Sequence, residues 1–170
     1  MDKTESELEK LKANYRKIQG IYNLPDFEKL NAEFSIEKIA ENETDFLIRE
    51  VTKVMAEKFS NYLRFVELVL NPVNSPMFIF SLIKTIGESE KKKLSEIYKE
   101  LARIELNLIE LDVDFSEKKE ADFINNSYKT WINLKKDFLK SRPMMTDSLP
   151  IHCGYQLAVR SEVLFHRLVE

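Results

Sequence analysis

The chain has 170 residues, a formal net charge of −3 and a pI of about 5.6. This mild acidity is atypical of dedicated nucleic-acid-binding proteins, which usually carry a basic surplus. A single cysteine, Cys153, excludes an internal disulfide framework and is typical of a reducing compartment. Residues 1–5 lack the apolar segment of a signal peptide. We therefore expect a cytoplasmic protein.

The composition favours helices. There are only three glycines and five prolines, while 44% of the residues are apolar and 32% are charged. Few helix breakers together with many Leu, Ile, Glu and Lys residues are typical of helical proteins. A chain of this length can bury roughly 70% of its unfolded surface. We predict an all-α fold, a single bundle of about five long helices followed by a short C-terminal helix or appendage.

The first two predicted helices are amphipathic. In residues 4–22, apolar side chains recur at steps of three and four, the spacing of one helix face. They are Leu8, Leu11, Tyr15, Ile18 and Tyr22. Pro25 and Asp26 then open a short second helix. Its expected buried face carries Phe27, Leu30 and Phe34.

The longest predicted helix begins at Asn42 or Thr44 and ends at Leu70. Its C-terminal part is apolar except for two charged residues on one face, Arg64 and Glu67. A helix segment that is apolar on nearly all sides is normally buried on nearly all sides. We therefore expect this part of the helix to lie in the interior.

A second apolar helix follows, with Pro76 at its first position and Gly87 at its end. The apolar segments within residues 62–83 are predicted to form a tight hairpin at the centre of the core. Alternatively, one apolar face is exposed in the monomer and covered by a partner. Prolines interrupt this stretch, and neither part is long enough to span a membrane. The candidate interaction residues are Phe65, Leu68, Met77, Phe78 and Phe80.

A regular seam follows in the second half of the chain. Its apolar residues alternate between steps of three and four, which suits helix packing at a shallow angle. They are Leu94, Ile97, Leu101, Ile104, Leu108 and Leu111. Ser116 and Glu120 mark the start of a further helix, which should carry the lone Trp131 on its inner face. Beside the seam, Glu105 is expected to be half-buried and paired with Arg49 or Arg64.

The composition changes near the C-terminus. Residues 1–141 contain nineteen lysines, whereas residues 142–170 contain none. Three interpretations stay open: a separate module with a short helix at about residues 155–169, a segment from another reading frame or a fusion, or chance in a short segment. We accordingly assign residues 4–140 to the bundle domain and residues 141–170 to a C-terminal tail.

The sequence predicts no catalytic, cofactor or metal site. A carboxylate-rich stretch is present, consisting of Glu105, Glu110, Asp112 and Asp114. However, neither histidine has a glutamate three residues before it, as a di-iron bundle requires. Adjacent His152 and Cys153 point in different directions in any regular structure and are poorly arranged for proton transfer. The three glycines are isolated, so no phosphate-binding loop is indicated.

Three functional hypotheses follow. The leading one is a non-catalytic protein that acts through protein–protein interaction, with self-association as its simplest form. The second is a nucleic-acid accessory protein that uses lysine clusters at residues 91–93, 118–119 and 135–136. Acidic neighbours accompany each cluster, a pattern typical of solvated helix faces. The third is an enzyme or small-ligand carrier with a pocket near Tyr128 and Trp131.

Overall fold

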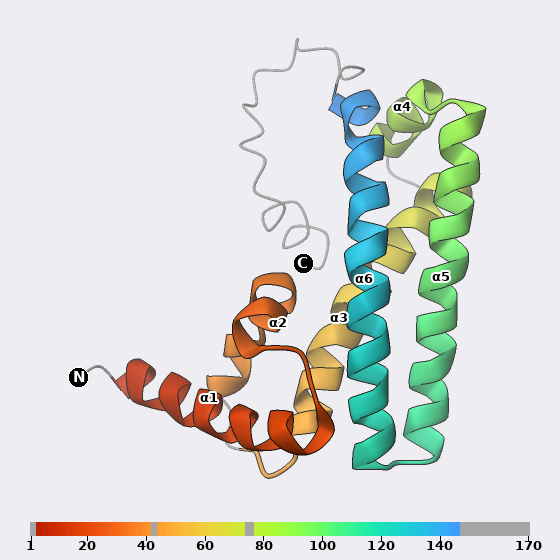
Figure 1. The fold of residues 1–170 in the computed structure, drawn as a ribbon. Coiled ribbons are helices and arrows are strands. Elements are labelled where there is room, and N and C mark those ends of the chain that lie inside the picture. The colour runs from red at the N-terminus through yellow and green to blue at the C-terminus, as the bar shows by residue number, and fades with distance from the viewer. Residues whose placement is uncertain (1–2, 42–43, 74–76, 147–170) are drawn as a thin grey trace.

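The computed structural model describes residues 3–41, 44–73 and 77–146, and all regular elements in these ranges are helical (Figure 1). The predicted all-α fold is confirmed. In chain order the elements are α1 (Lys3–Tyr22), α2 (Phe27–Phe34), the 3-10 helix η1 (Ile36–Glu41), α3 (Leu47–Leu70), α4 (Met77–Thr85), α5 (Glu88–Val113) and α6 (Glu117–Thr146).

Three long helices form the body of the molecule. The antiparallel helices α5 and α6 form a hairpin, and α3 packs against both (Figure 1). Helix α1 runs across the long helices instead of along them, and together with α2 and η1 it covers the lower part of the bundle in the view of Figure 1. Helix α4 lies at the opposite end. The bundle therefore has a thick end and a thin end.

The short helix α2 has clear signals at both ends. At its N-terminus, Asp26 Oδ1 accepts a hydrogen bond of 3.1 Å from the backbone N–H of Glu28. At its C-terminus, Ser35 adopts a left-handed conformation with φ of 54°, and its N–H donates to the carbonyl of Asn31. The predicted buried face is confirmed for Phe27, Leu30 and Phe34.

The core lies where α1, α2 and η1 meet the long helices. Its fully buried side chains come from all of these elements and include Tyr15, Leu30, Ile36, Met55, Phe59, Leu101 and Ile124. The Tyr15 hydroxyl donates to the carbonyl of Pro25 at 2.8 Å, and burial raises the pKa of Tyr15. This bond ties α1 to the turn that precedes α2.

Trp131 is only 2% exposed, which confirms its predicted place on the inner face of α6. Its ring lies 4.9 Å from that of Tyr62 and 5.9 Å from those of Phe34 and Phe59, measured between centroids. Edge-on and tilted contacts of this kind add to the gain from burying aromatic area. The indole therefore joins α2, α3 and α6.

The predicted hairpin is not the centre of the core. In the C-terminal part of α3 only Val66 and Val69 are buried. In α4, Ile79 is buried but lies outside the main core cluster, and Met77 is 82% exposed. The physical reason is the position of α1, α2 and η1, which supply packing partners to the first part of α3. The apolar C-terminal end of α3 has only the nine-residue α4 and the long helices α5 and α6 as packing partners among the described elements.

Two predicted helix boundaries are also wrong. Helix α3 begins at Leu47, after both predicted starts, because Thr44 Oγ1 accepts the N–H of Phe46 at 3.1 Å and turns the chain before the helix. Helix α4 ends at Thr85, and Gly87 instead directly precedes α5. Both errors displace a boundary without changing the order of elements.

The predicted α5 seam is confirmed. Leu94, Ile97, Leu101 and Ile104 are buried, and the last two seam residues are half-buried. Helix α6 continues to Thr146, past the composition boundary at residue 140. The predicted helix at residues 155–169, with His152 and Cys153 just before it, lies outside the described residues.

Candidate interaction surface

Exposed apolar side chains occur at both ends of the molecule. At the α4 end, Met77 is 82% and Phe80 is 38% exposed, as an interaction surface requires. Phe65 and Leu68 of α3 are half-buried, and Phe65 packs against the core. The side chain of Phe78 lies outside the described residues. The structure therefore brings only part of the predicted set to the surface.

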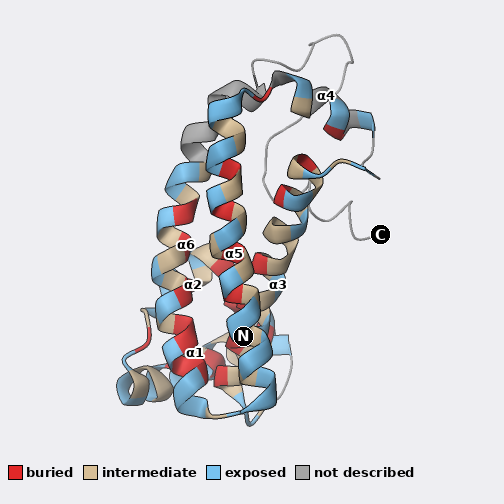
Figure 2. Cartoon of the chain, turned by 90° about the vertical axis from the view of Figure 1, so that its right-hand side faces the viewer, coloured by how far each residue is buried: buried red, intermediate tan, exposed pale blue. Residues whose placement is uncertain are grey.

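A second apolar surface lies on α5 and was not singled out from the sequence. Leu106, Ile109 and Val113 are 61%, 56% and 84% exposed. Their spacing of three and four places them on one side of the helix, roughly opposite the buried seam. Figure 2 colours the chain by burial and shows exposed residues along α5. We call Ala102, Leu106, Ile109 and Val113 the α5 outer face.

The sequence carried a signal for this surface. The steps of three and four between Leu106, Ile109 and Val113 indicate an apolar stripe as clearly as the seam does. Helical spacing alone predicts the longer seam as the buried side, and it does not predict that a second, shorter stripe on the same helix is exposed.

Charged residues border the α5 outer face. Toward its N-terminal end, Lys99 pairs with Glu96 at 3.0 Å, and Arg103 pairs with Glu100. Toward its C-terminal end lies Glu110, which makes no ion pair with the residues that the structure describes. The border therefore carries two acid–base pairs at its N-terminal end and the acid Glu110 at its C-terminal end.

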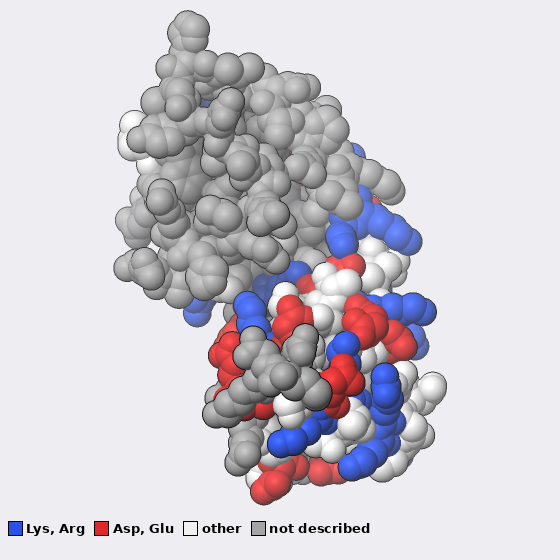
Figure 3. Space-filling model, turned by 90° about the vertical axis from the view of Figure 1, so that its left-hand side faces the viewer, with Lys and Arg blue, Asp and Glu red and all other residues white. Residues whose placement is uncertain are grey.

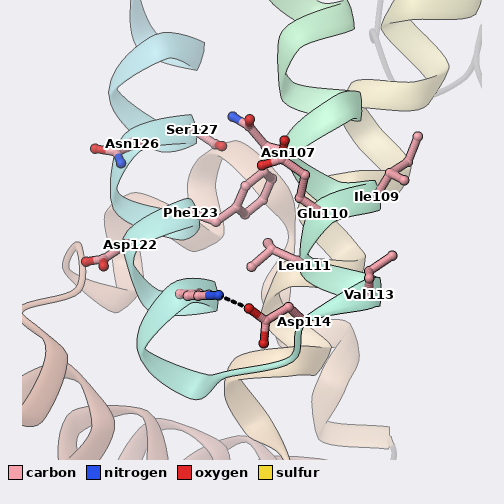
Figure 4. A pocket seen from close by; sticks show the side chains of 11 residues that line it. Asn107, Ile109, Glu110, Leu111, Val113, Asp114, Asp122, Phe123, Asn126 and Ser127 are labelled. Atoms are coloured by element: carbon pink, nitrogen blue, oxygen red, sulfur yellow. Dashed lines mark hydrogen bonds and ion pairs between the residues drawn. The ribbon is translucent and has the colours of Figure 1, made fainter.

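A groove of about 620 Å³ runs between α5 and α6 beside this surface (Figure 4). Leu111 and Phe123 point toward each other across it, whereas Ile109 and Val113 point away from α6. Asp114 at its lower end pairs with Lys119. Ile109 and Val113 also contribute to the lining of this groove, so the groove and the α5 outer face adjoin each other on one helix.

Glu105 is half-buried, as the sequence predicts, but its partner is different. Its carboxylate accepts hydrogen bonds of 2.9 and 3.2 Å from the hydroxyl of Ser60. Arg49 instead pairs with Asp112 at 3.6 Å, and no ion pair of Arg64 is present in the described ranges. The expected Glu105–Arg pair is wrong because Ser60, and not an arginine, faces Glu105 from α3.

Glu120 is the one buried side chain in the described residues with an oxygen, Oε2, that has no hydrogen-bond partner. The residue is 4% exposed. Burial raises the pKa of Glu120, the charge of Arg49 partly offsets this rise, and the negative charges of Asp112 and Glu117 add to it. An isolated carboxylate in such a position favours its protonated form.

Glu33 is the contrasting case. Its carboxylate accepts from Trp131 Nε1 at 2.9 Å and from Lys135 Nζ at 2.7 and 2.9 Å. Burial by itself raises the pKa of Glu33, but these hydrogen bonds outweigh it and leave that pKa below its ordinary value. Lys58 donates to the Glu33 carbonyl and lies 4.9 Å from the Trp131 ring centroid.

This packing argues against the predicted ligand pocket near Tyr128 and Trp131. The indole is surrounded by aromatic rings, and its N–H is already bonded to Glu33. The two cavities described by their lining residues lie elsewhere, one in the groove and one between α5 and α6 near Lys93 and Asp137.

The lysine clusters are accompanied by acids in space as well as in sequence. Lys91 pairs with Glu88 at 2.9 Å, and Lys119 and Lys135 also have carboxylate partners. On the face drawn in Figure 3, basic and acidic atoms are interleaved over the part of the chain that is coloured. Such a surface lacks the continuous positive potential that phosphate backbones require.

Among the described residues, no three His, Cys, Asp or Glu side chains are grouped closely enough to hold a metal ion. No helix in these ranges has the length and apolar character needed to cross a membrane.

Comparisons with protein-family models, with curated proteins and with solved structures found no match for this chain.

Proposed function

We propose that this chain is a non-catalytic protein whose α5 outer face binds another protein. The observation that supports this is the exposure of three large aliphatic side chains, Leu106, Ile109 and Val113, on one side of a long helix whose opposite side is already packed. Scattered apolar residues are normal on surfaces, but a row on one helix face favours an interface.

The proposal extends to the α4 end as a second contact region. There Phe65, Leu68, Met77, Phe78 and Phe80 come from two adjoining helices. The exposure of Met77 and Phe80 supports this part of the proposal. We rank it below the α5 outer face because Phe65 is largely committed to the core. The cytoplasm is the location we propose, since a lone cysteine suits a reducing compartment.

The test is affinity capture followed by cross-linking, with the full chain as bait. Leu106→Glu combined with Ile109→Glu places two charges on the α5 outer face and should abolish capture of the proteins that the unaltered chain retains. Ile21→Glu is the matched control, because Ile21 is 72% exposed and lies on α1, a different helix. Unchanged circular dichroism establishes that the variants fold. Equal capture by the double variant and the unaltered chain would refute the proposal.

A further inference from the structure

We infer that the partner of the α5 outer face is a second copy of this chain, packed antiparallel so that the two α5 helices are related by a two-fold axis between Leu106 and Ile109. This inference rests on the proposed function and specifies its partner and geometry. A two-fold contact uses the same surface on both copies, so that surface must be complementary to itself.

The apolar residues meet this requirement. In an antiparallel pair centred between residues 106 and 109, Leu106 of each copy meets Ile109 of the other. Ala102, which is half-buried in the monomer, then meets Val113 of the second copy. The small Ala102 side chain faces the larger Val113, so each end of the contact combines one small and one large residue.

The charged residues that border the face are also consistent with a surface that is complementary to itself. Lys99 and Arg103 lie toward the N-terminal end of the face, each paired with an acid three residues earlier, and Glu110 lies toward its C-terminal end. Antiparallel packing brings Arg103 of one copy near Glu110 of the other, twice by symmetry. Parallel packing would instead place like charges together, which is unfavourable.

The existing ion pairs do not prevent this arrangement. The side chains of Lys99 and Glu96 are 57% and 62% exposed, and those of Arg103 and Glu100 are 70% and 43% exposed. Exposed pairs of residues three apart on a helix contribute little and exchange partners readily. Glu110 has no ion pair to give up within the described part of the chain.

The contact is small, so association should be weak, with a dissociation constant on the order of 10–100 µM. The first experiment is size-exclusion chromatography with light scattering and analytical ultracentrifugation at concentrations up to about 1 mM. We expect a concentration-dependent dimer. A monomer throughout this range would overturn the inference. If the Leu106/Ile109 double variant nevertheless failed to capture a different protein that the unaltered chain retains, the proposed function would stand without the dimer.

Charge reversal tests the orientation. Arg103→Glu or Glu110→Arg alone places like charges together at two symmetric positions and should weaken the dimer about tenfold. The combined swap, Arg103→Glu with Glu110→Arg, restores both cross-pairs and should bring the affinity back within about threefold. Asp122→Lys is the control, because this exposed acid lies on α6 and not on α5. A dimer insensitive to the single reversals, or a swap that fails to recover, would overturn the inference.

Spin-label distances give an independent measurement. In a chain with Cys153→Ser, a label at position 106 should lie close to its copy, near the roughly 10 Å spacing of packed helices. A label at position 91 should lie about 50 Å from its copy, since 33 residues of helix separate the equivalent heights. Short distances at both positions would indicate parallel packing and contradict the proposal.

Discussion

Around Trp131 the interior is closed and its polar atoms are paired, whereas near the α5–α6 turn a buried carboxylate oxygen lacks a partner and aliphatic side chains face solvent. Both regions use the same three long helices. They differ because rings of α2 and α3 enclose Trp131, whereas Leu106, Ile109 and Val113 lie on the side of α5 away from its buried seam. The closed region around Trp131 is organised for stability. The region near the turn leaves a buried oxygen unbonded and apolar side chains exposed, which makes it the functional candidate.

The largest effect should come from opening the closed region. Trp131→Ala removes a fully packed indole and leaves a cavity, so the free energy of unfolding should fall by about 3–5 kcal/mol. Urea denaturation monitored by circular dichroism measures it. Trp131→Phe keeps one aromatic ring but removes the rest of the indole and the N–H donor to Glu33, and should cost less, about 1–3 kcal/mol. Equal losses in the two variants would show that packing is not the main contribution.

Glu33→Gln tests whether the paired carboxylate stabilises the closed region. We expect a loss of about 1.5 kcal/mol at pH 7, because the ion pair with Lys135 is partly exposed. The pKa of Glu33 is below its ordinary value of 4.5, so the folded state holds this proton less tightly than the unfolded state does. Its stabilising contribution is present above pH 4.5 and is lost as the pH falls through the folded-state pKa. Denaturation at pH 7 and in acid should show that the difference in the free energy of unfolding between Glu33→Gln and the unaltered chain becomes smaller as the pH falls.

With rising pH, Glu120→Gln should change the free energy of unfolding in the opposite direction to Glu33→Gln. The pKa of Glu120 is raised above 4.5, so its folded state binds the proton more tightly, and stability is lost as the pH rises from 4.5 through the folded-state pKa. A neutral amide removes this loss, so the stability of Glu120→Gln relative to the unaltered chain should rise between pH 5 and pH 8. Denaturation at pH 5 and pH 8 checks it. Glu105→Gln is the control, since that carboxylate has Ser60 as a donor. A relative stability of Glu120→Gln that does not rise between pH 5 and pH 8 would contradict the assignment.

The smallest effect should come from the exposed region. Leu106→Ala should change the free energy of unfolding by less than about 0.5 kcal/mol in dilute solution, because its side chain is already in water. The same substitution at Leu101, on the seam of the same helix, should cost about 2–5 kcal/mol. Thermal denaturation of both variants below the expected dimer concentration measures the contrast. A large loss at Leu106 would mean that this face packs within the monomer.

Features encoded by neighbouring residues could be predicted from the sequence. The seam from Leu94 to Ile104 follows directly from helical spacing, and Asp26 is a favoured residue for capping the helix it precedes. Each depends on residues within a few turns of one another. The inner position of Trp131 follows for the same reason.

Features that depend on partners far apart in the sequence could not be predicted from it. Periodicity identifies an apolar face but not what covers it, so the end of α3 was assigned to the core while Leu106 was overlooked. Glu33 and Lys135 are 102 residues apart in sequence, and no local pattern joins them. The burial of Glu120 likewise depends on where α1 and α3 lie, which helical spacing does not encode.

The bond between Tyr22 and Glu117 has a consequence for the order of folding. The Tyr22 hydroxyl donates to Glu117 at 2.8 Å across a separation of 95 residues, whereas α5 and α6 are joined by the short segment 114–116. Closing a short loop costs less chain entropy than closing a long one, so the α5–α6 hairpin forms early and α1 docks late. In the native state α1 should therefore open first, and its backbone amides should exchange with deuterium before those of the hairpin.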